Sequence, residues 1–250
     1  DGVVADGRLT ARGAVDAKAS VSAMAAAAAE LAAAGGPASG RLVVLATYSE
    51  ETRDTSMPSA LENLGQPPDA AIVGEPTSLQ PCIAQRGQLL VELHWAGDQV
   101  HAGWAAGRQP PPINAITLAA RDLARLDELV FDRAHPLLGS VAVTPTQLSA
   151  GVARNVTPPT CFAMLDIRTT PAYEHAEVVS MIREHLSARI EIYSDRLVPA
   201  ETPAGSRLLP AVLAARPEAT PFVSPTCSDW VYMRHLDAVK LGPGASRQSH

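Results

Sequence analysis

The hydrophobic positions in the first part of the chain predict alternating helices and strands. Residues 16–34 are rich in Ala, Met and Leu, which favour a helix, and Gly35-Gly36-Pro37 ends that run. Residues 41–48 and 69–73 are short apolar runs, typical of strands that are buried on both faces of a sheet. This order predicts an α/β domain.

The pattern changes in the middle of the chain. Residues 88–95, QLLVELHW, alternate between apolar and polar side chains, as in a strand with one exposed face. Further elements follow with clear periodicity: a helix over 113–129, strands over 141–148 and 160–168, a helix over 173–188 and a strand over 189–193. This β-α-β-β-α-β order predicts a small open sheet with two helices on one face, as in ferredoxin-like modules.

These two patterns define the expected domains. After residue 199 the chain is similar to its first part again, with a helix over 208–215 and then short strands and Gly/Pro turns. We therefore expect residues 1–84 and 199–250 to form one α/β domain with a mixed sheet. Residues 85–198 form an α+β module inserted into it.

Composition excludes several classes of protein. With 46% hydrophobic residues, the 250-residue chain can bury a substantial core. A formal net charge of −6 argues against a nucleic-acid-binding surface or a basic membrane patch, and no apolar run suits a membrane span. Three distant cysteines without a C-x-x-C motif favour free thiols and a cytoplasmic location. Because the first residue is Asp1 rather than a methionine, we interpret the chain as a fragment.

Acidic residues occupy positions where an α/β sheet binds ligands. Glu50 and Glu51 follow the predicted strand 41–48, Glu75 follows the next strand, and Asp16 opens the first helix. Each has an ordinary alternative: a helix cap, a solvated loop or a turn. Carboxylates gathered at the carboxyl ends of strands would repel one another without a cation. Together they favour a metal site, for which His250 is the natural imidazole ligand and Zn²⁺, Mn²⁺ or Co²⁺ the suitable ions.

Motifs of other enzyme classes do not occur. The sequence contains no phosphate-binding G-x-x-x-x-G-K-[ST], no G-x-G-x-x-G and no G-x-S-x-G. His101, between a Gly97-Asp98 turn and Ala102-Gly103, is by itself an ordinary loop histidine.

A set of ordered motifs is similar to one family. Residues 7–18, GRLTARGAVDAK, resemble the G-R-L-x-G-R-G-A-x-D-x-K signature of the zinc-dependent aminoacylase/carboxypeptidase metallopeptidases, of the acetylornithine deacetylase and succinyl-diaminopimelate desuccinylase type. Further matches keep the family's order: SEE at 49–51, GEPT at 74–77, HA at 101–102, NAI at 114–116, NVTP at 155–158, DIR at 166–168, TCSD at 226–229 and GPG at 242–244 before His250. They cover essentially the whole chain.

The resemblance implies a role for each acidic residue. Asp16 would bridge two metal ions, Glu75 would bind the first ion, and Glu51 and His250 would bind the second. Glu50 would be the general base that activates a metal-bound water.

The resemblance also implies a function for the inserted module. It would act as a lid and dimerisation domain of a homodimer, in which His101 reaches the partner subunit's active site and polarises the scissile carbonyl. Asn155 and Arg168 would contact the oxyanion or the substrate carboxylate.

The implied activity is hydrolysis of an N-acyl amino acid, or release of lysine or ornithine from an amino-group carrier protein, with two Zn²⁺ per subunit and Co²⁺ or Mn²⁺ as alternatives. Two alternative functions stay open: a dipeptidase or aminoacylase of the same family, and a non-catalytic fragment that acts through its dimerisation domain. The family's early H-x-D segment and its T-x-x-E tail after His250 are absent, Ala11 replaces a Gly, and Ser49 replaces an Asp. The missing histidine predicts weak binding of the first metal by this chain alone.

Overall fold

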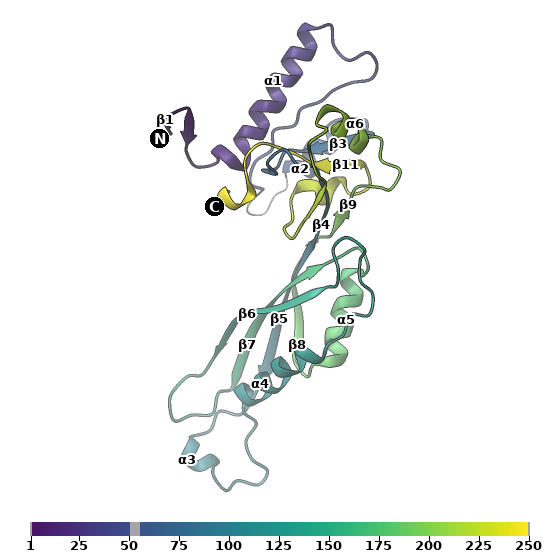
Figure 1. Cartoon of the computed structure of the whole chain (residues 1–250). Helices are drawn as coiled ribbons and strands as arrows, with labels where there is room; N and C mark the ends of the chain where they lie inside the picture. The colour runs from purple at the N-terminus through teal and green to yellow at the C-terminus, as the bar shows by residue number, and fades with distance from the viewer. Residues whose placement is uncertain (1, 51–55, 250) are drawn as a thin grey trace. The chain divides into compact units, whose positions relative to one another are not determined.

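The structure is a computed structural model that describes residues 2–50 and 56–249. It divides into two compact units, one made of Asp1–Gln85 with Ala200–His250 and the other of Arg86–Pro199 (Figure 1). Among the helices of the described residues, none has both the length and the hydropathy that a membrane crossing requires.

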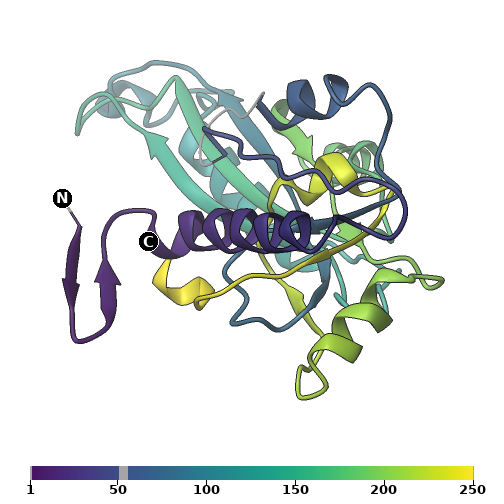
Figure 2. The same cartoon turned by 90° about the horizontal axis from the view of Figure 1, so that it is seen from above.

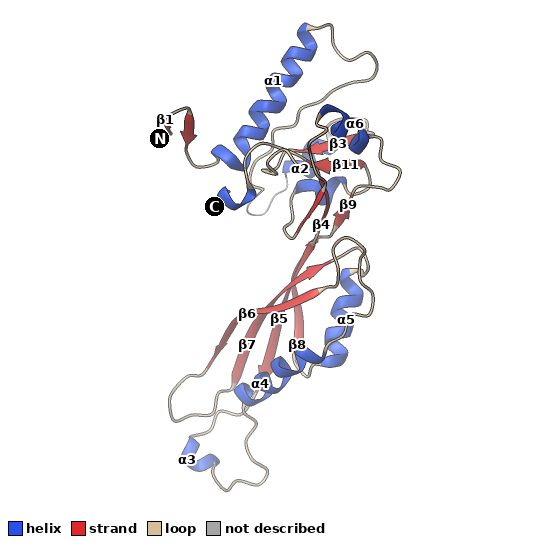
Figure 3. Cartoon of the chain, in the orientation of Figure 1, coloured by secondary structure: helices blue, strands red, loops and turns tan. Residues whose placement is uncertain are grey.

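The first unit is built on a mixed sheet (Figure 3). Its strand β4 (Cys82–Gln85) pairs in parallel with β10 (Phe222–Ser224) and antiparallel with β11 (Asp237–Lys240) and β9 (Ala200–Glu201). Strand β3 (Ala70–Val73) runs parallel to β11 at the edge of the sheet. The mixed α/β architecture predicted from the sequence is therefore confirmed.

Helices and a hairpin complete this unit. They are the hairpin strands β1 (Val3–Ala5) and β2 (Arg8–Thr10), the helices α1 (Ala19–Ala33), α2 (Ser56–Glu62) and α6 (Leu208–Ala215), and the short 3-10 helices Asp229–Met233 and Ser246–Gln248. The core lies around the fully buried Trp230, with Met57, Val73 and Cys82 packed in the same cluster. Of the residues of α1, Ser20 is the buried one, so its Ala-rich sequence forms a helix through intrinsic propensity rather than burial.

One predicted strand is wrong. Residues 41–48 form no strand, and the side chains of Leu42 and Val43 are 55% and 41% exposed. A strand needs a neighbour that accepts and donates its ladder hydrogen bonds. Within the described residues no strand pairs with this segment, so its apolar composition alone does not produce one.

The second unit is a four-stranded antiparallel sheet with the order β6-β7-β5-β8. Its elements are β5 (Gly87–Ala96), α3 (Ala102–Ala105), α4 (Ala115–Arg125), the 3-10 helix Leu126–Glu128, β6 (Ala142–Ala150), β7 (Thr160–Thr169), α5 (His175–His185) and β8 (Arg189–Leu197). Apart from the one-turn α3, this is the predicted β-α-β-β-α-β order, which is confirmed.

Alternation along the central strands gives this sheet a buried and an open face. On β5 the side chains of Leu89, Val91 and Leu93 are fully buried in one cluster with residues of α4 and α5. The side chains between them, including Glu92 and His94, are partly exposed and point to the opposite face.

Candidate metal and catalytic site

Asp16 lies in a kinked turn before α1 and not in the helix. The helix begins at Ala19 instead of residue 16, and its N-cap is Lys18. Within the π-type turn Ala14–Lys18, Asp16 has backbone angles of φ −112° and ψ 101°, outside the helical region. The ordinary alternative for Asp16, a helix cap, is therefore excluded.

The C-terminal segment lies beside this turn. In two perpendicular views the segment drawn in yellow runs next to the start of α1 (Figures 1 and 2). The 3-10 helix Ser246–Gln248 contacts the turn Ala14–Lys18. Residues from opposite ends of the chain thus share one edge of the first unit.

Glu75 stands at the carboxyl end of β3, where a loop from the parallel strand β11 meets it. Leu241 N donates to Val73 O at 2.9 Å, and Thr77 N donates to Gly242 O at 3.2 Å. Because parallel strands end at the same edge of a sheet, the segments around Glu75 and Gly242 are hydrogen-bonded neighbours.

The charges around Glu75 form a cluster. Burial is the main reason that the pKa of Glu75 rises to about 8, the Lys240 ammonium opposes the rise, and the carboxylates of Asp16, Glu50 and Asp229 add to it. Asp16, Glu50 and Glu75 come from three separate segments. The structure therefore brings three of the residues singled out from the sequence close enough to interact electrostatically.

Two members of this cluster were not assigned a role from the sequence. Asp229 and Lys240 are both buried, and Thr47 Oγ1 donates to Asp229 Oδ2 at 3.4 Å. Asp229 belongs to the TCSD motif, and Lys240 is the last residue of β11, between the apolar residues Val239 and Leu241. A charged residue inside an apolar strand is the signal that could have identified Lys240.

The donor chemistry of this cluster suits a divalent cation, although among the described residues no three of its ligand atoms lie within 4.8 Å of one another. Among the described residues, Glu75 interacts with the carboxylates of Asp16, Glu50 and Asp229 and with the ammonium of Lys240, so negative charge predominates around it. Carboxylate oxygens are good ligands for Zn²⁺, Mn²⁺ and Co²⁺, and a bound cation favours the ionised form of Glu75. The other predicted ligands, Glu51 and His250, lie outside the described residues.

The raised pKa of Glu75 predicts a pH-dependent stability of the metal-free protein. Between the ordinary value of 4.5 and about 8, the folded state keeps a proton on Glu75 that the unfolded chain releases. The free energy of unfolding should therefore fall as pH rises through this interval. Urea unfolding in the presence of a chelator, from about pH 5 to about pH 8, measures this slope. A Glu75→Gln variant should show a shallower slope, and an unchanged slope contradicts the assignment.

Gly242 is required by close packing in the same region. A Cβ at this position would lie 2.5 Å from Glu75 O and would also meet Ser20 Oγ. We expect Gly242→Ala to lower the free energy of unfolding by about 1–3 kcal/mol, because neither the Glu75 loop nor α1 can move without losing contacts. Gly205→Ala is the matched control, since a Cβ there meets nothing within 4 Å. Equal urea midpoints for the two variants would disprove this explanation.

In the second unit, His101 and Asn155 form a hydrogen-bonded pair. His101 Nδ1 accepts from Gly103 N at 3.1 Å, and Nε2 lies 3.0 Å from the Asn155 side-chain amide. Asn155 Nδ2 is the amide atom that faces Nε2, so the tautomer of His101 decides which group donates in this contact. The two loops thus place a ring nitrogen of His101 beside the Asn155 amide nitrogen.

Backbone packing fixes the position of this pair. Ala102 N donates to Asn155 O at 2.8 Å, which ties the two loops together. A Cβ at Gly97 would lie 2.7–2.9 Å from backbone atoms of Ile113, Ala115 and Pro158, so the segment that leads to His101 needs a glycine.

Arg168 is not part of this pair. It lies on β7 eight residues beyond Thr160, which pairs with Ala96 at the end of the sheet nearer His101. That separation is about 26 Å along the strand. The Arg168 guanidinium binds both carboxylate oxygens of Asp166, at 2.7 and 2.9 Å.

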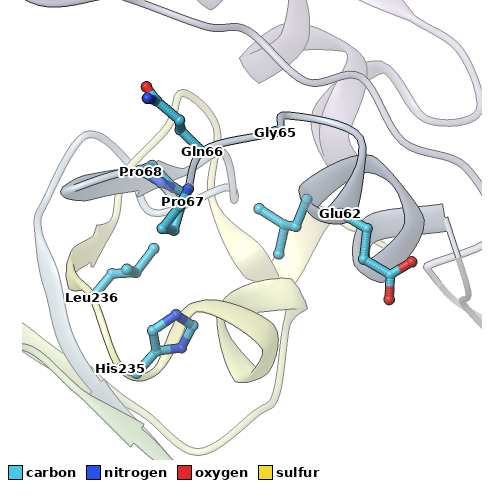
Figure 4. Close-up of a pocket in the computed structure, with 8 residues that line it drawn as sticks. Glu62, Gly65, Gln66, Pro67, Pro68, His235 and Leu236 are labelled. Atoms are coloured by element: carbon cyan, nitrogen blue, oxygen red, sulfur yellow. The ribbon is translucent and has the colours of Figure 1, made fainter.

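A surface hollow in the first unit contains none of the predicted site residues. Its volume is about 260 Å³ (Figure 4). Its lining comes from the end of α2 and from two loops: Leu61, Glu62, Gly65, Gln66, Pro67, Pro68, His235 and Leu236.

A family model matches the whole chain, and two curated relatives match most of it. The model of the peptidase family M20/M25/M40 matches residues 1–250. The chain is 28% identical over 225 residues to an acetylornithine deacetylase of Klebsiella pneumoniae (strain 342), covering 84% of this chain and 57% of that protein. An acetylornithine deacetylase of Shigella sonnei (strain Ss046) is also 28% identical, over 228 residues, with the same coverage. The chain therefore spans a little over half the length of these relatives.

Solved structures share the fold at low sequence identity. An aminopeptidase PepT from Bacillus cereus ATCC 10987 superimposes with a TM-score of 0.76 and 17% identity, over 97% of this chain and 67% of that one. An M20 family metallo-carboxypeptidase, Sso-CP2 from Sulfolobus solfataricus, gives a TM-score of 0.67 and 17% identity, over 96% and 70%.

Proposed function

Because the chain belongs to the peptidase family M20/M25/M40, we propose that it hydrolyses the amide bond of an N-acyl amino acid with bound divalent cations. The observation that carries this proposal is the carboxylate cluster around Glu75, which includes Asp16 and Glu50. N-acetylornithine is the first candidate substrate, because the two matched relatives are acetylornithine deacetylases.

In this proposal the acidic residues have two functions, metal binding and proton transfer. Asp16 and Glu75, together with Glu51 and His250, would hold two Zn²⁺. When bound, these cations would polarise the amide carbonyl and lower the pKa of a water molecule. Glu50 would accept a proton from the attacking water on its carboxylate and later deliver it to the leaving amine. The proximity of Glu50 to Glu75 supports this division.

His101 would stabilise the negative charge that develops on the substrate oxygen. With its proton on Nε2, His101 would be a donor of the kind that oxyanion stabilisation requires, and the Gly103 and Asn155 contacts hold its ring. We propose a homodimer in which His101 of one subunit acts in the other subunit's site. Asn155 would orient His101 or join it as a donor, and Arg168 would bind a substrate carboxylate.

We also propose a range of alternative substrates and a cytoplasmic location for the protein. Release of lysine or ornithine from a carrier protein, and hydrolysis of dipeptides, use the same chemistry and are the alternative substrates. No disulfide joins Cys82, Cys161 and Cys227, which agrees with the reducing cytoplasm.

The test is hydrolysis of N-acetylornithine with Zn²⁺ or Co²⁺. It is run on this chain and on the same chain preceded by a segment that carries the H-x-D motif of the family. Ornithine release that requires the metal supports the proposal. Hydrolysis of dipeptides but not of N-acetylornithine would make dipeptides the substrate class. Bound metal without hydrolysis of any of these amides would overturn the proposed catalytic function.

A further inference from the structure

A second group of potential metal ligands lies on the open face of the sheet in the second unit. Glu92 and His94 come from β5, and Glu191 comes from the edge strand β8. The helices α4 and α5 cover the opposite face of this sheet. The group is thus separate from the acidic cluster of the first unit.

The distances within this group match those of a metal site. His94 Nε2 lies 3.1 Å from Glu92 Oε2 and 3.6 Å from Glu191 Oε2, and one ligand atom of each residue lies within 4.8 Å of the others. A tetrahedral Zn²⁺ with bonds of about 2.0–2.1 Å separates its ligand atoms by about 3.3 Å. Small rotations of the two glutamates therefore give this spacing, and water completes the coordination.

The register of the two strands gives the ion an electrostatic role. Glu92 and Glu191 are directly opposite each other on neighbouring antiparallel strands. Like charges in this arrangement destabilise the pairing, and a cation between them removes the repulsion. The sheet thus presents two carboxylates that gain from a shared positive ion.

Neighbouring side chains orient the ligands without occupying the site. Arg189 Nη1 pairs with Glu191 Oε1, which is the other oxygen of that carboxylate, and leaves Oε2 toward His94. The ring of Phe162 contacts the His94 ring edge-on, with centroids 5.5 Å apart. Polar partners such as Arg189 are known to orient carboxylate ligands in metal sites.

We propose that Glu92, His94 and Glu191 bind one divalent transition-metal ion of the Zn²⁺ type, which links the edge strand β8 to β5. Two carboxylates and one imidazole are a donor set that selects such ions over Mg²⁺ or Ca²⁺. Since Glu191 is half exposed, the ion can enter directly from solvent. The proposal does not depend on the proposed catalytic function.

The experiment is a Zn²⁺ titration of the full chain, with the bound ions counted by native mass spectrometry and affinities measured by calorimetry. We expect the wild type to bind one ion more than His94→Ala. Glu191→Gln, a nearly isosteric change at a half-exposed position, should weaken that ion at least about tenfold. His235→Ala, which removes an exposed imidazole of the first unit, should bind as many ions as the wild type.

Hydrogen exchange locates the ion. Zn²⁺ should slow the exchange of amides in Arg189–Leu197 in the wild type and in His235→Ala, and leave them unchanged in Glu191→Gln. If both ligand variants bind as many ions as the wild type, with affinities within about twofold, or if β8 gains no protection in the wild type, the site does not exist.

Discussion

Replacement of Glu50 by glutamine is expected to lower kcat for amide hydrolysis by about 10²–10⁴-fold, the usual contribution of a general base. The amide has nearly the shape of the carboxylate but cannot accept the proton of the attacking water. Because the proposed ligands are other residues, the metal content should stay the same, and KM should change little.

The measurement is steady-state hydrolysis of N-acetylornithine together with metal analysis of the same samples. Glu62→Gln is the matched control, because Glu62 is an exposed acid of α2 outside the cluster, and its activity should equal that of the wild type. Unchanged turnover in Glu50→Gln would refute its role as base. Loss of both metal and activity would instead make Glu50 a ligand.

The second unit could be predicted from the sequence because burial there follows a simple period. In β5 the pattern QLLVELHW matches a strand whose alternate residues face α4 and α5. The amphipathic pattern over 113–129 likewise matches α4 and the short helix after it. A sheet with one covered face leaves this signal in every strand, so local sequence is sufficient.

The first unit was harder to predict because its elements depend on pairing. Residues 41–48 have the composition of a buried strand, yet they lack a neighbouring strand in the part of the chain that the structure describes. The predicted start of α1, residue 16, lies three residues before the observed start at Ala19. The turn Ala14–Lys18 has no sequence signal that separates it from the helix. In residues 41–48, apolar composition alone therefore determines neither burial nor strand pairing.

For the candidate site, the motifs identified residue types but not their surroundings. The sequence indicated Asp16, Glu50 and Glu75 as a set, and the structure shows that these three influence one another. It gave no indication that Lys240 would oppose them or that Asn155 would contact His101. Such contacts join residues that are distant in sequence, so spacing along the chain cannot reveal them.

A buried carboxylate holds the second unit together, and its removal should be the most costly single change to stability. Asp122, on the core-facing side of α4, is 3% exposed. Its Oδ2 accepts four hydrogen bonds, from Trp95 Nε1 at 2.7 Å and from Ser187 N, Ser187 Oγ and Ala188 N at 2.9 Å each. One oxygen thus connects β5, α4 and the turn between α5 and β8.

We expect Asp122→Ala to reduce the free energy of unfolding of this unit by about 3–4 kcal/mol, because it leaves the buried Trp95 indole N–H and the Ala188 amide without an acceptor. Native-state hydrogen exchange of β5 and β7 amides reports on this unit by itself. Asp122→Asn keeps an acceptor oxygen and should lose clearly less. Asp127→Ala removes an exposed carboxylate just beyond α4 and should change stability by less than about 0.5 kcal/mol. If Asp122→Ala were as stable as Asp127→Ala, the four hydrogen bonds would contribute nothing net, and the apolar contacts between α4 and the sheet would carry the stability of the unit.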